Sequence, residues 1–319
     1  MRFTSRVICL LSAVLLTCSI SLSASAGSSR AVPSETSPVS ATTGSAYAES
    51  VILFVLEGIG QDSPKVGPMP VLNRLVKEGA ATWSAQTVAP PLRLPAMASL
   101  LTGLPADKHG ITWDAFEFSR GYPRPPTLFD YLDLSGGRDS AIFFMDYQMC
   151  GPLKPECSPE RLVSYIRQYF RKASSGHGYG HAILALPHLL VVHLPDAGRA
   201  GAAHGWASKE YREALRSVDH AMGAVLGLFK EHGLLARTTV FVTALSGTGA
   251  AIPAAVNGQP TTASSLVPWI VSGVGIKASH VIRQPVSILD TGATVMRTLG
   301  LETHTEWDSR VVEEVFRNT

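Results

Sequence analysis

The regular alternation of short apolar runs with helical patterns is the feature that most constrains the fold of this chain. Apolar runs bounded by turn residues occupy 50–58, 140–145, 188–195, 238–245 and 267–273. Runs of this length are typical of strands buried on both faces of a parallel sheet. Helical spacing appears in 69–80, from about Ser208, and in 285–301, ending at Gly300. The alternation predicts one α/β domain over about 49–319, a three-layer α/β/α sandwich with a mainly parallel central sheet.

The N-terminal residues have the pattern of an export signal. Arg2 and Arg6 precede an apolar run over 7–16, and small residues at 24–26 provide a cleavage site before Gly27. We therefore expect a signal peptide over 1–26 and a periplasmic or extracellular protein. The alternative is a membrane anchor, but the run is shorter than a spanning helix needs, so we expect no transmembrane span after cleavage. Residues 27–48 are rich in Ser, Thr, Pro and Ala and predict a linker.

Charge and cysteine content narrow the classes of partner. Without residues 1–26 the chain has 25 basic and 25 acidic residues, and no cluster of Lys and Arg stands out. This balance argues against nucleic acid as a partner. Cys150 and Cys157 close a short loop rich in Pro and Gly, and in an exported protein they most simply form a disulfide. The alternative is a metal site, but the local sequence offers no further ligands.

Loops at the carboxyl ends of the predicted strands are the expected location of functional groups. In open α/β sheets ligands bind in a crevice at that edge. The loops are the one beginning at Glu57 and the segments 89–97, 195–206 and 245–260. We therefore expect these four segments to surround one crevice.

The same loops carry a recognisable pattern. It includes "VILFVLEGIGQD", "AQTVAPPLRLPAMASLLTGLPADKHGITWD", "LPDAGRAGAAHGW", "TTVFVTALSG" and "VPWIVSGVGIK". In these segments the chain resembles the alkaline phosphatase superfamily, in particular its type I phosphodiesterase/nucleotide pyrophosphatase branch. The resemblance implies an alkaline-phosphatase-like fold and a hydrolase of phosphoric esters and anhydrides. It also implies two zinc ions held by Asp and His side chains, and a Thr or Ser nucleophile at a helix start.

Two of the positions that the resemblance marks have changed their chemistry. The first strand of the family ends in an aspartate that binds metal, whereas here it ends in Glu57. The position of the nucleophile, before Leu-Pro, is occupied by Arg93. Arginine has no nucleophilic oxygen and keeps its positive charge. It therefore places a fixed charge where the resemblance implies metal ions.

The third segment lacks its ligands in register. The aspartate and histidine that the family carries there correspond to Gly198 and Ala202. Asp196 and His204 are nearby but out of register. We interpret Asp196 as a residue that caps or anchors its loop, and His204 as one that makes a structural hydrogen bond. Both remain candidates for binding a ligand.

The fourth segment has lost an Asp-His pair. Leu245 and Ser246 occupy the two positions, and no Asp, Glu or His occurs from Gly233 to Ser279. A shifted alignment cannot restore ligands that are not there. Because a zinc site needs at least three good protein ligands, we expect no zinc ion and no other cofactor.

The leading hypothesis is a catalytically inactive protein that binds an anionic ligand or a partner in the remodelled crevice. Arg93 at a helix N-terminus favours negative charge, but it is equally expected to pair with Glu57. A second hypothesis is a hydrolase with weak or altered activity, with Glu57, Asp196, His193 or His204 as general base. A third is a purely structural subunit.

Overall fold

The computed structural model describes residues 47–114, 118–121, 123–145, 157–176, 178–179, 182–183, 185–249 and 265–317. The predicted signal peptide, almost all of the predicted linker and Cys150 lie outside these residues. The disulfide between Cys150 and Cys157 therefore stays a prediction.

The centre of the molecule is a seven-stranded sheet with the strand order β3-β6-β1-β7-β8-β2-β9. From β3 to β7 the neighbouring strands are parallel, and β8 is antiparallel to both β7 and β2. Its strands are β1 (Ser50–Leu56), β2 (Ala80–Gln86), β3 (Ser140–Phe143), β6 (Leu189–Leu194), β7 (Thr238–Ala244), β8 (Leu266–Gly273) and β9 (His280–Val281). Strands β4 (Gly178–Tyr179) and β5 (Ala182–Ile183) form a separate two-stranded sheet.

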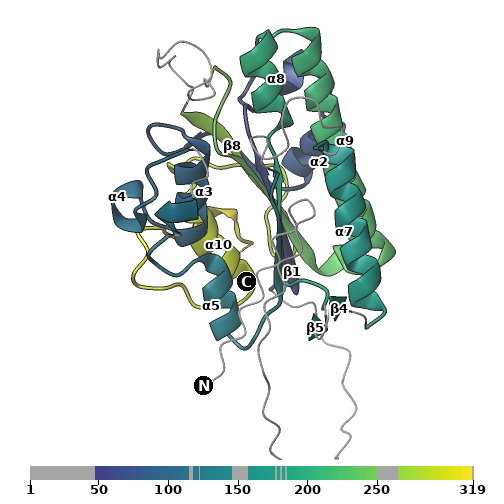
Figure 1. The fold of residues 1–319 in the computed structure, drawn as a ribbon, viewed down its shortest axis with the longest axis vertical. Helices are drawn as coiled ribbons and strands as arrows, with labels where there is room; N and C mark the ends of the chain where they lie inside the picture. The colour runs from purple at the N-terminus through teal and green to yellow at the C-terminus, as the bar shows by residue number, and fades with distance from the viewer. Residues whose placement is uncertain are drawn as a thin grey trace, which may run out of the picture.

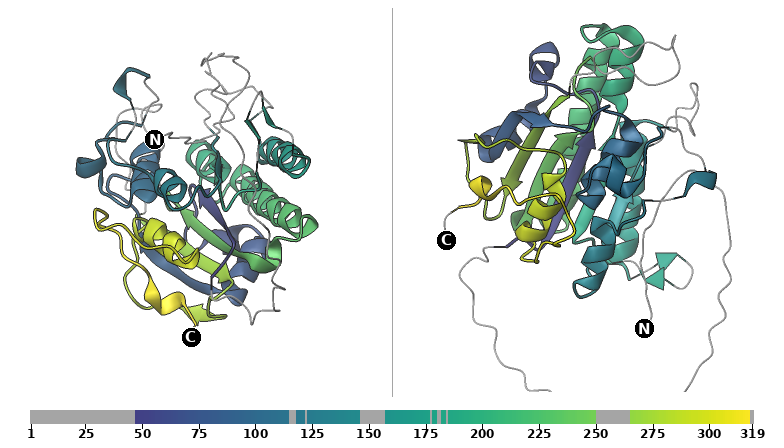
Figure 2. Two further views of the ribbon diagram at one scale, coloured as in Figure 1. Left: turned by 90° about the horizontal axis from the view of Figure 1, so that it is seen from below. Right: turned by 90° about the vertical axis from the view of Figure 1, so that its left-hand side faces the viewer.

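Helices cover both faces of the large sheet (Figure 1). One layer contains α2 (Pro70–Glu78), α7 (Pro159–Ser174), α8 (Asp196–His204) and α9 (Lys209–Glu231). The other contains α3 (Arg93–Thr102), α4 (Ala106–His109), α5 (Leu128–Leu134) and α10 (Asp290–Thr298). A single turn, α1 (Ser63–Val66), follows the first strand, and short 3-10 helices occupy Phe118–Arg120, Leu235–Arg237 and Glu313–Val315. The view along the sheet shows the two helical layers on either side of it (Figure 2).

The predicted strands and the α/β/α sandwich are confirmed. Strands β1, β6 and β7 are buried along their whole length, as strands in the middle of a covered sheet must be. The helix expected from about Ser208 begins there, with Ser208 as its N-cap, because its side chain accepts a hydrogen bond from the backbone N–H of Tyr211. Among the described residues, no helix is both long and apolar enough to cross a membrane.

Two details differ from the sequence prediction. The apolar run of β8 gives no sign of its antiparallel direction, because burial on both faces removes the alternation that would distinguish the two kinds of strand. The helix expected over 285–301 begins only at Asp290 and ends at Thr298. A carboxylate oxygen of Asp290 accepts a hydrogen bond from the N–H of Ser287, so the residues before it form a turn.

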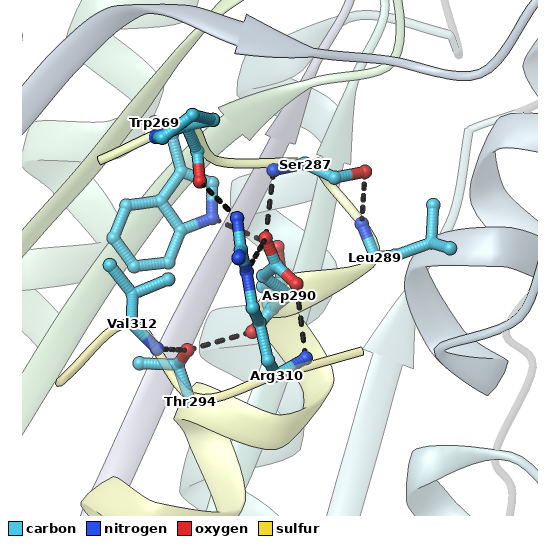
Figure 3. A network of polar contacts seen from close by, with 9 residues as sticks. Trp269, Ser287, Leu289, Asp290, Thr294, Arg310 and Val312 are labelled. Carbon is cyan, nitrogen blue, oxygen red and sulfur yellow. Dashed lines mark hydrogen bonds and ion pairs between the residues drawn. The ribbon is translucent and has the colours of Figure 1, made fainter. Parts of the chain in front are cut away.

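The same carboxylate fixes the C-terminal segment on α10 (Figure 3). Asp290 also accepts a hydrogen bond from the N–H of Arg310. The hydroxyl of Thr294 donates to the Asp290 carbonyl and accepts from the N–H of Val312. These buried bonds satisfy backbone groups of a segment that has no regular structure of its own.

Candidate functional site

The loop after β1 is held in place from both sides. The N–H of Gly58 donates to the carbonyl oxygen of Ser246, at 2.9 Å, and lies 3.2 Å from its hydroxyl oxygen. The hydroxyl of Tyr211 lies 2.8 Å from the Gly58 carbonyl and also contacts Ser63. Burial raises the pKa of Tyr211 to about 12. These hydrogen bonds fix the position of the loop, and with it the position of Glu57.

Glu57 contacts a histidine of the neighbouring strand. The Nε2 atom of His193 lies 2.9 Å from Oε1 of Glu57, and its Nδ1 atom lies 3.2 Å from the carbonyl oxygen of Met145. The ring of His193 has no exposed surface, whereas 15% of the Glu57 side chain is exposed. Within the pair, therefore, only the carboxyl group reaches solvent.

The two contacts of His193 fix the number of protons on the pair. A carbonyl oxygen only accepts, so Nδ1 carries a hydrogen that it donates to Met145. One further proton must lie between Nε2 and Glu57, because two unprotonated acceptors do not form a hydrogen bond. A single hydrogen bond therefore joins Nε2 of His193 to the Glu57 carboxyl group.

Arg93 and Asp114 meet at the start of α3. The N-cap position of this helix is Leu92, whose side chain cannot accept a hydrogen bond. Instead, the N–H of Leu94 donates to the carboxylate of Asp114, at 2.8 Å. The guanidinium of Arg93 lies 3.4 Å from the backbone oxygen of Asp114. An anion of the protein itself therefore occupies the helix N-terminus, where we expected an open anion site.

The charge of Asp114 is set by opposing influences. Burial raises the pKa of its carboxyl group, and the negative charge of Glu57 adds to this rise. The hydrogen bond from Leu94 and the positive charge of Arg93 lower the pKa and partly offset the effect of burial.

An aromatic ring joins these groups. The ring of Phe144 is stacked on His193, with ring centroids 4.4 Å apart and planes at 11°. The guanidinium carbon of Arg93 lies 6.0 Å from the centroid of the same ring. Phe144 thus contacts both His193 and Arg93. Its distance from the Arg93 guanidinium is at the outer limit of a cation–π contact. The five residues Glu57, Arg93, Asp114, Phe144 and His193 form what we call the remodelled centre.

Gly198 lies against Glu57 with no room for a side chain. A Cβ atom built there would come 2.8 Å from the Cβ of Glu57. Gly58 is equally crowded, because its Cβ would lie 2.4 Å from the Cα of Gly198. Gly201 packs in the same way against the ring of Trp206. The first turns of α8 therefore fill the space that an aspartate at position 198 would need.

The other residues expected around the crevice lie elsewhere. Ala202 and His204 are exposed on α8, and among the described residues His204 has no hydrogen-bond partner. The buried Asp196 begins α8 and lies 3.8 Å from the guanidinium of Arg199. Asp196 and His204 line a cavity of about 400 Å³ together with Glu160 and Glu213. Both residues thus belong to the lining of this cavity, on a segment that is a helix rather than the expected loop.

Leu245 and Ser246 do lie at the strand edge beside Glu57, but they have structural contacts. Leu245 is fully buried, its N–H donates to the Leu56 carbonyl and its own carbonyl accepts from the hydroxyl of Thr87. Ser246 accepts from Gly58, as described above. These residues hold three chain segments together.

The described residues do not fit the zinc pair that the resemblance implies. No group of three or more His, Cys, Asp and Glu side chains among them is placed to hold a metal ion. Position 198 has no space for a carboxylate, and position 245 is an apolar side chain in the core. The only retained carboxylate, Glu57, is hydrogen-bonded to His193.

No sequence motif marks Asp114 or Phe144 as a site residue, and His193 is predicted only as one of several candidate bases. His193 stands inside an apolar strand, a setting typical of a satisfied core residue, and its bond to the Met145 carbonyl is of that kind. Asp114 follows an irregular segment, so no periodicity marked it. The only signal available was the missing cap residue before α3, which required an acceptor from another part of the chain.

Comparison with known proteins gives a consistent result for fold and family. Among solved structures, murine ectonucleotide pyrophosphatase/phosphodiesterase 5 matches with a TM-score of 0.63 and 13% identity, over 84% of this chain and 100% of that chain. An inactive variant of the same murine protein, in complex with AMP, matches with a TM-score of 0.62 and 13% identity, over 84% of this chain and 100% of that chain. A sulfatase from Bacteroides thetaiotaomicron, connected with the metabolism of glycosaminoglycans, matches with a TM-score of 0.62 and 14% identity, over 83% of this chain and 75% of that chain.

These structural matches establish an alkaline-phosphatase-like fold. No protein in a search of curated sequences matches the chain. The model of the family described as type I phosphodiesterase / nucleotide pyrophosphatase matches residues 51–251, which include the whole remodelled centre. This match covers more than half of the sequence. The chain belongs to the type I phosphodiesterase / nucleotide pyrophosphatase family.

Proposed function

We propose that the chain is an exported, catalytically inactive member of this family that binds an anionic ligand or partner at Arg93. The observation that carries the proposal is the contact between Glu57 and His193. The one carboxylate retained from the expected metal site is bonded within the protein, and none of the five residues of the remodelled centre has a hydroxyl group.

The nearest hydroxyl on α3 does not replace the missing nucleophile. Ser99 is fully buried and lies 2.9 Å from Nε2 of His109. The Nδ1 atom of His109 accepts a hydrogen bond from the N–H of Ile111, so Nε2 carries the hydrogen and donates it to Ser99. A histidine in this tautomer cannot take the proton of the serine, which general-base activation requires.

Arg93 supports the binding part of the proposal. It is half-buried, it keeps its charge at any accessible pH, and its planar group suits carboxylate, sulfate and phosphate oxygens. Asp114 already occupies the helix N-terminus, so the guanidinium rather than the helix is the group that attracts a ligand.

A turnover assay tests the absence of catalysis. The purified protein is assayed on p-nitrophenyl phosphate and bis-p-nitrophenyl phosphate with added zinc, and its metal content is measured. We expect no turnover above buffer and much less than one zinc per chain. Stoichiometric zinc, with turnover that disappears in Glu57→Ala, would contradict the proposal.

A thermal-shift assay tests the binding site. We expect phosphate or sulfate to raise the melting temperature of the wild type, and Arg93→Ala to lose this shift. Arg167→Ala is the matched control, because Arg167 is an exposed arginine on α7 that pairs with Glu231. A shift that is unchanged in Arg93→Ala contradicts binding at Arg93.

The alternative, a hydrolase with altered activity, is favoured by the same pair of residues. Glu57 reaches solvent while His193 holds its other side, an arrangement suited to a general base that acts on water. Such an activity would resist EDTA and disappear in Glu57→Gln. Metal-independent turnover of this kind in the assay above would replace the first proposal.

A further inference from the structure

A groove between α2 and α9 lies at the end of the sheet opposite to the remodelled centre. Its volume is about 660 Å³, and its lining includes Thr238, the first residue of β7, and Gly273, the last residue of the antiparallel β8. The remodelled centre lies at the other end, where β1 runs into Glu57. A ligand in the groove would therefore contact neither Glu57 nor Arg93.

Two glycines on α9 determine where the two helices touch. At Gly223 a Cβ atom would lie 3.1 Å from Cγ2 of Val71, so α9 lies directly against α2 at this point. One turn further along α9, at Gly227, a Cβ atom would meet no atom within 4 Å. Glycine inside a helix is unfavourable relative to alanine, and no close contact requires it at position 227. The absence of a side chain there keeps the groove open.

The walls of the groove are mainly apolar. Leu75 of α2, Leu226 of α9 and Val240 of β7 belong to the buried core and also line the groove, and the half-buried Leu235 adds a further side chain. A hollow of several hundred Å³ with apolar walls and a few polar groups is typical of sites for small molecules. A hydrocarbon chain that fills it would be removed from water, which is the main source of affinity in such sites.

The charged residues of the groove are exposed and include more cations than anions. Arg74 and Glu78 come from α2, and Lys230 comes from α9. Burial raises the pKa of the neighbouring Asp219, and backbone hydrogen bonds and the charge of Arg74 partly offset this rise, so Arg74 already interacts with a carboxylate of the protein. Within the part of the chain that the structure describes, the side chain of Lys230 has no ion pair or hydrogen bond. Lys230 is therefore the cation that is available to a ligand.

We propose that the groove is a second ligand site, which binds a single-chain amphiphile with an anionic head group, such as a fatty acid. The chain lies on Leu75, Leu226 and Val240, and the carboxylate lies at Lys230. An anionic head group is favoured over a cationic one because two cations and one carboxylate line the groove. The inference goes beyond the proposed function, since no residue of the remodelled centre belongs to this site.

Three probes of equal chain length test the class of ligand. Decanoate, decan-1-ol and decyltrimethylammonium are titrated calorimetrically into the full chain, below their critical micelle concentrations and at neutral pH. We expect decanoate to bind most tightly, decan-1-ol about threefold more weakly, and decyltrimethylammonium more weakly still. Octanoate should bind about tenfold more weakly than decanoate, because it buries two methylene groups fewer.

Substitution of Gly227 tests the location. Gly227→Leu places a side chain in the open space and should weaken the binding of both decanoate and decan-1-ol at least about tenfold. Ser164→Leu adds the same side chain on the exposed face of α7 and is the matched control, with unchanged binding expected. Gly227→Ala guards against loss of structure, because its single methyl group should still weaken binding about threefold. Melting temperatures show whether each variant is folded.

Substitutions of charged residues test the position of the head group. Lys230→Met should weaken decanoate about threefold to tenfold and leave decan-1-ol unchanged, because it removes the charge and keeps an apolar side chain. Lys209→Met, at the other end of α9, is the matched control. Glu78→Gln should strengthen decanoate about threefold, since it removes the one carboxylate that lines the groove near Arg74 and Lys230.

The outcomes separate this site from the one proposed at Arg93. Arg93→Ala should leave decanoate binding unchanged; a loss there would place the fatty acid at Arg93, which overturns the inference and supports the first site. No binding of decanoate by the wild type, undiminished binding by folded Gly227→Leu, or tighter binding of decan-1-ol or decyltrimethylammonium than of decanoate would each overturn it as well. These last results would leave the proposed function at Arg93 unaffected.

Discussion

Nε2 of His193 lies 2.9 Å from Oε1 of Glu57, so a hydrogen bond joins these two ionisable side chains at the end of a buried strand. A lone carboxylate in this position would be costly, because a buried charge without a partner loses its hydration. The pair explains how Glu57 remains in a centre whose other expected ligands have been replaced by Gly, Ala, Leu and Ser.

The strength of this contact is measurable in a double-mutant cycle. We expect Glu57→Gln and His193→Asn to be coupled by about 1–3 kcal/mol in the free energy of unfolding, because either change leaves a buried partner unsatisfied. The measurement is urea denaturation of the wild type, both single variants and the double variant. Lys209 and Glu213, an exposed pair 3.6 Å apart, serve as the control, with an expected coupling below about 1 kcal/mol. Equal coupling energies in the two cycles would contradict a hydrogen bond between Glu57 and His193.

The crowding at Gly198 predicts an unusual cost for a small substitution. Gly198→Ala should destabilise the protein by about 1–3 kcal/mol, because its Cβ would lie 2.8 Å from that of Glu57. Gly227 on α9 is the matched control, since a Cβ there meets no atom within 4 Å. Gly227→Ala should be neutral or stabilise by up to about 1 kcal/mol, as expected for glycine in a helix. Thermal unfolding that ranks the two variants in the opposite order would refute the packing described for α8.

Burial of His109 predicts a loss of stability in mild acid. Burial lowers the pKa of His109 from its ordinary value of 6.5, so the folded protein resists a proton that the unfolded chain accepts. The contribution of His109 to the free energy of unfolding is therefore complete above about pH 6.5, and it is lost as the pH falls below this value. His188 contributes in the same direction, because burial, and then Arg138, lower its pKa as well.

Urea denaturation between pH 7.5 and 5.5 measures this dependence. His109→Gln should lower stability at neutral pH and reduce its decrease on acidification, since the variant has no imidazole to protonate. His204→Gln changes an exposed histidine and should leave the slope unaltered. A slope that is the same in His109→Gln and the wild type would assign the effect to other groups.

The predicted disulfide is open to a direct chemical test. We expect Cys150 and Cys157 to resist alkylation until the protein is reduced, as judged by intact mass. In the chain-entropy description, a bond closing a loop of this length stabilises by about 2–3 kcal/mol. Cys157→Ser should therefore melt at a lower temperature than the wild type without reductant and at a similar temperature with it. Free thiols in the untreated protein would exclude the bond.

The fold was predictable to the extent that burial determines it. Strands β1, β6 and β7 and helices α2 and α9 follow from apolar spacing, because each must hide one or both faces. The direction of β8 was not predictable, since a strand buried on both faces has the same apolar pattern in a parallel and in an antiparallel pairing. The shortened α10 depends on a single side chain, Asp290, that turns back to the N–H of Ser287.

The site was predictable only where a motif fixed the register. The motif marked Glu57 and Arg93, which the structure links through His193 and Phe144. It did not predict that Asp196 and His204 lie on a helix and line a cavity with Glu160 and Glu213. Contacts between distant segments, such as Asp114 with Leu94, leave no local pattern.

The close approach of Gly58 to Gly198 also bears on the history of the chain. Their backbones touch where two side chains would otherwise stand, so neither glycine can change while the other segment keeps its place. Aspartate at 198 would require α8 to move away from Glu57, at a cost in stability. The contact between the two segments therefore limits which side chains sequence drift can bring to positions 58 and 198.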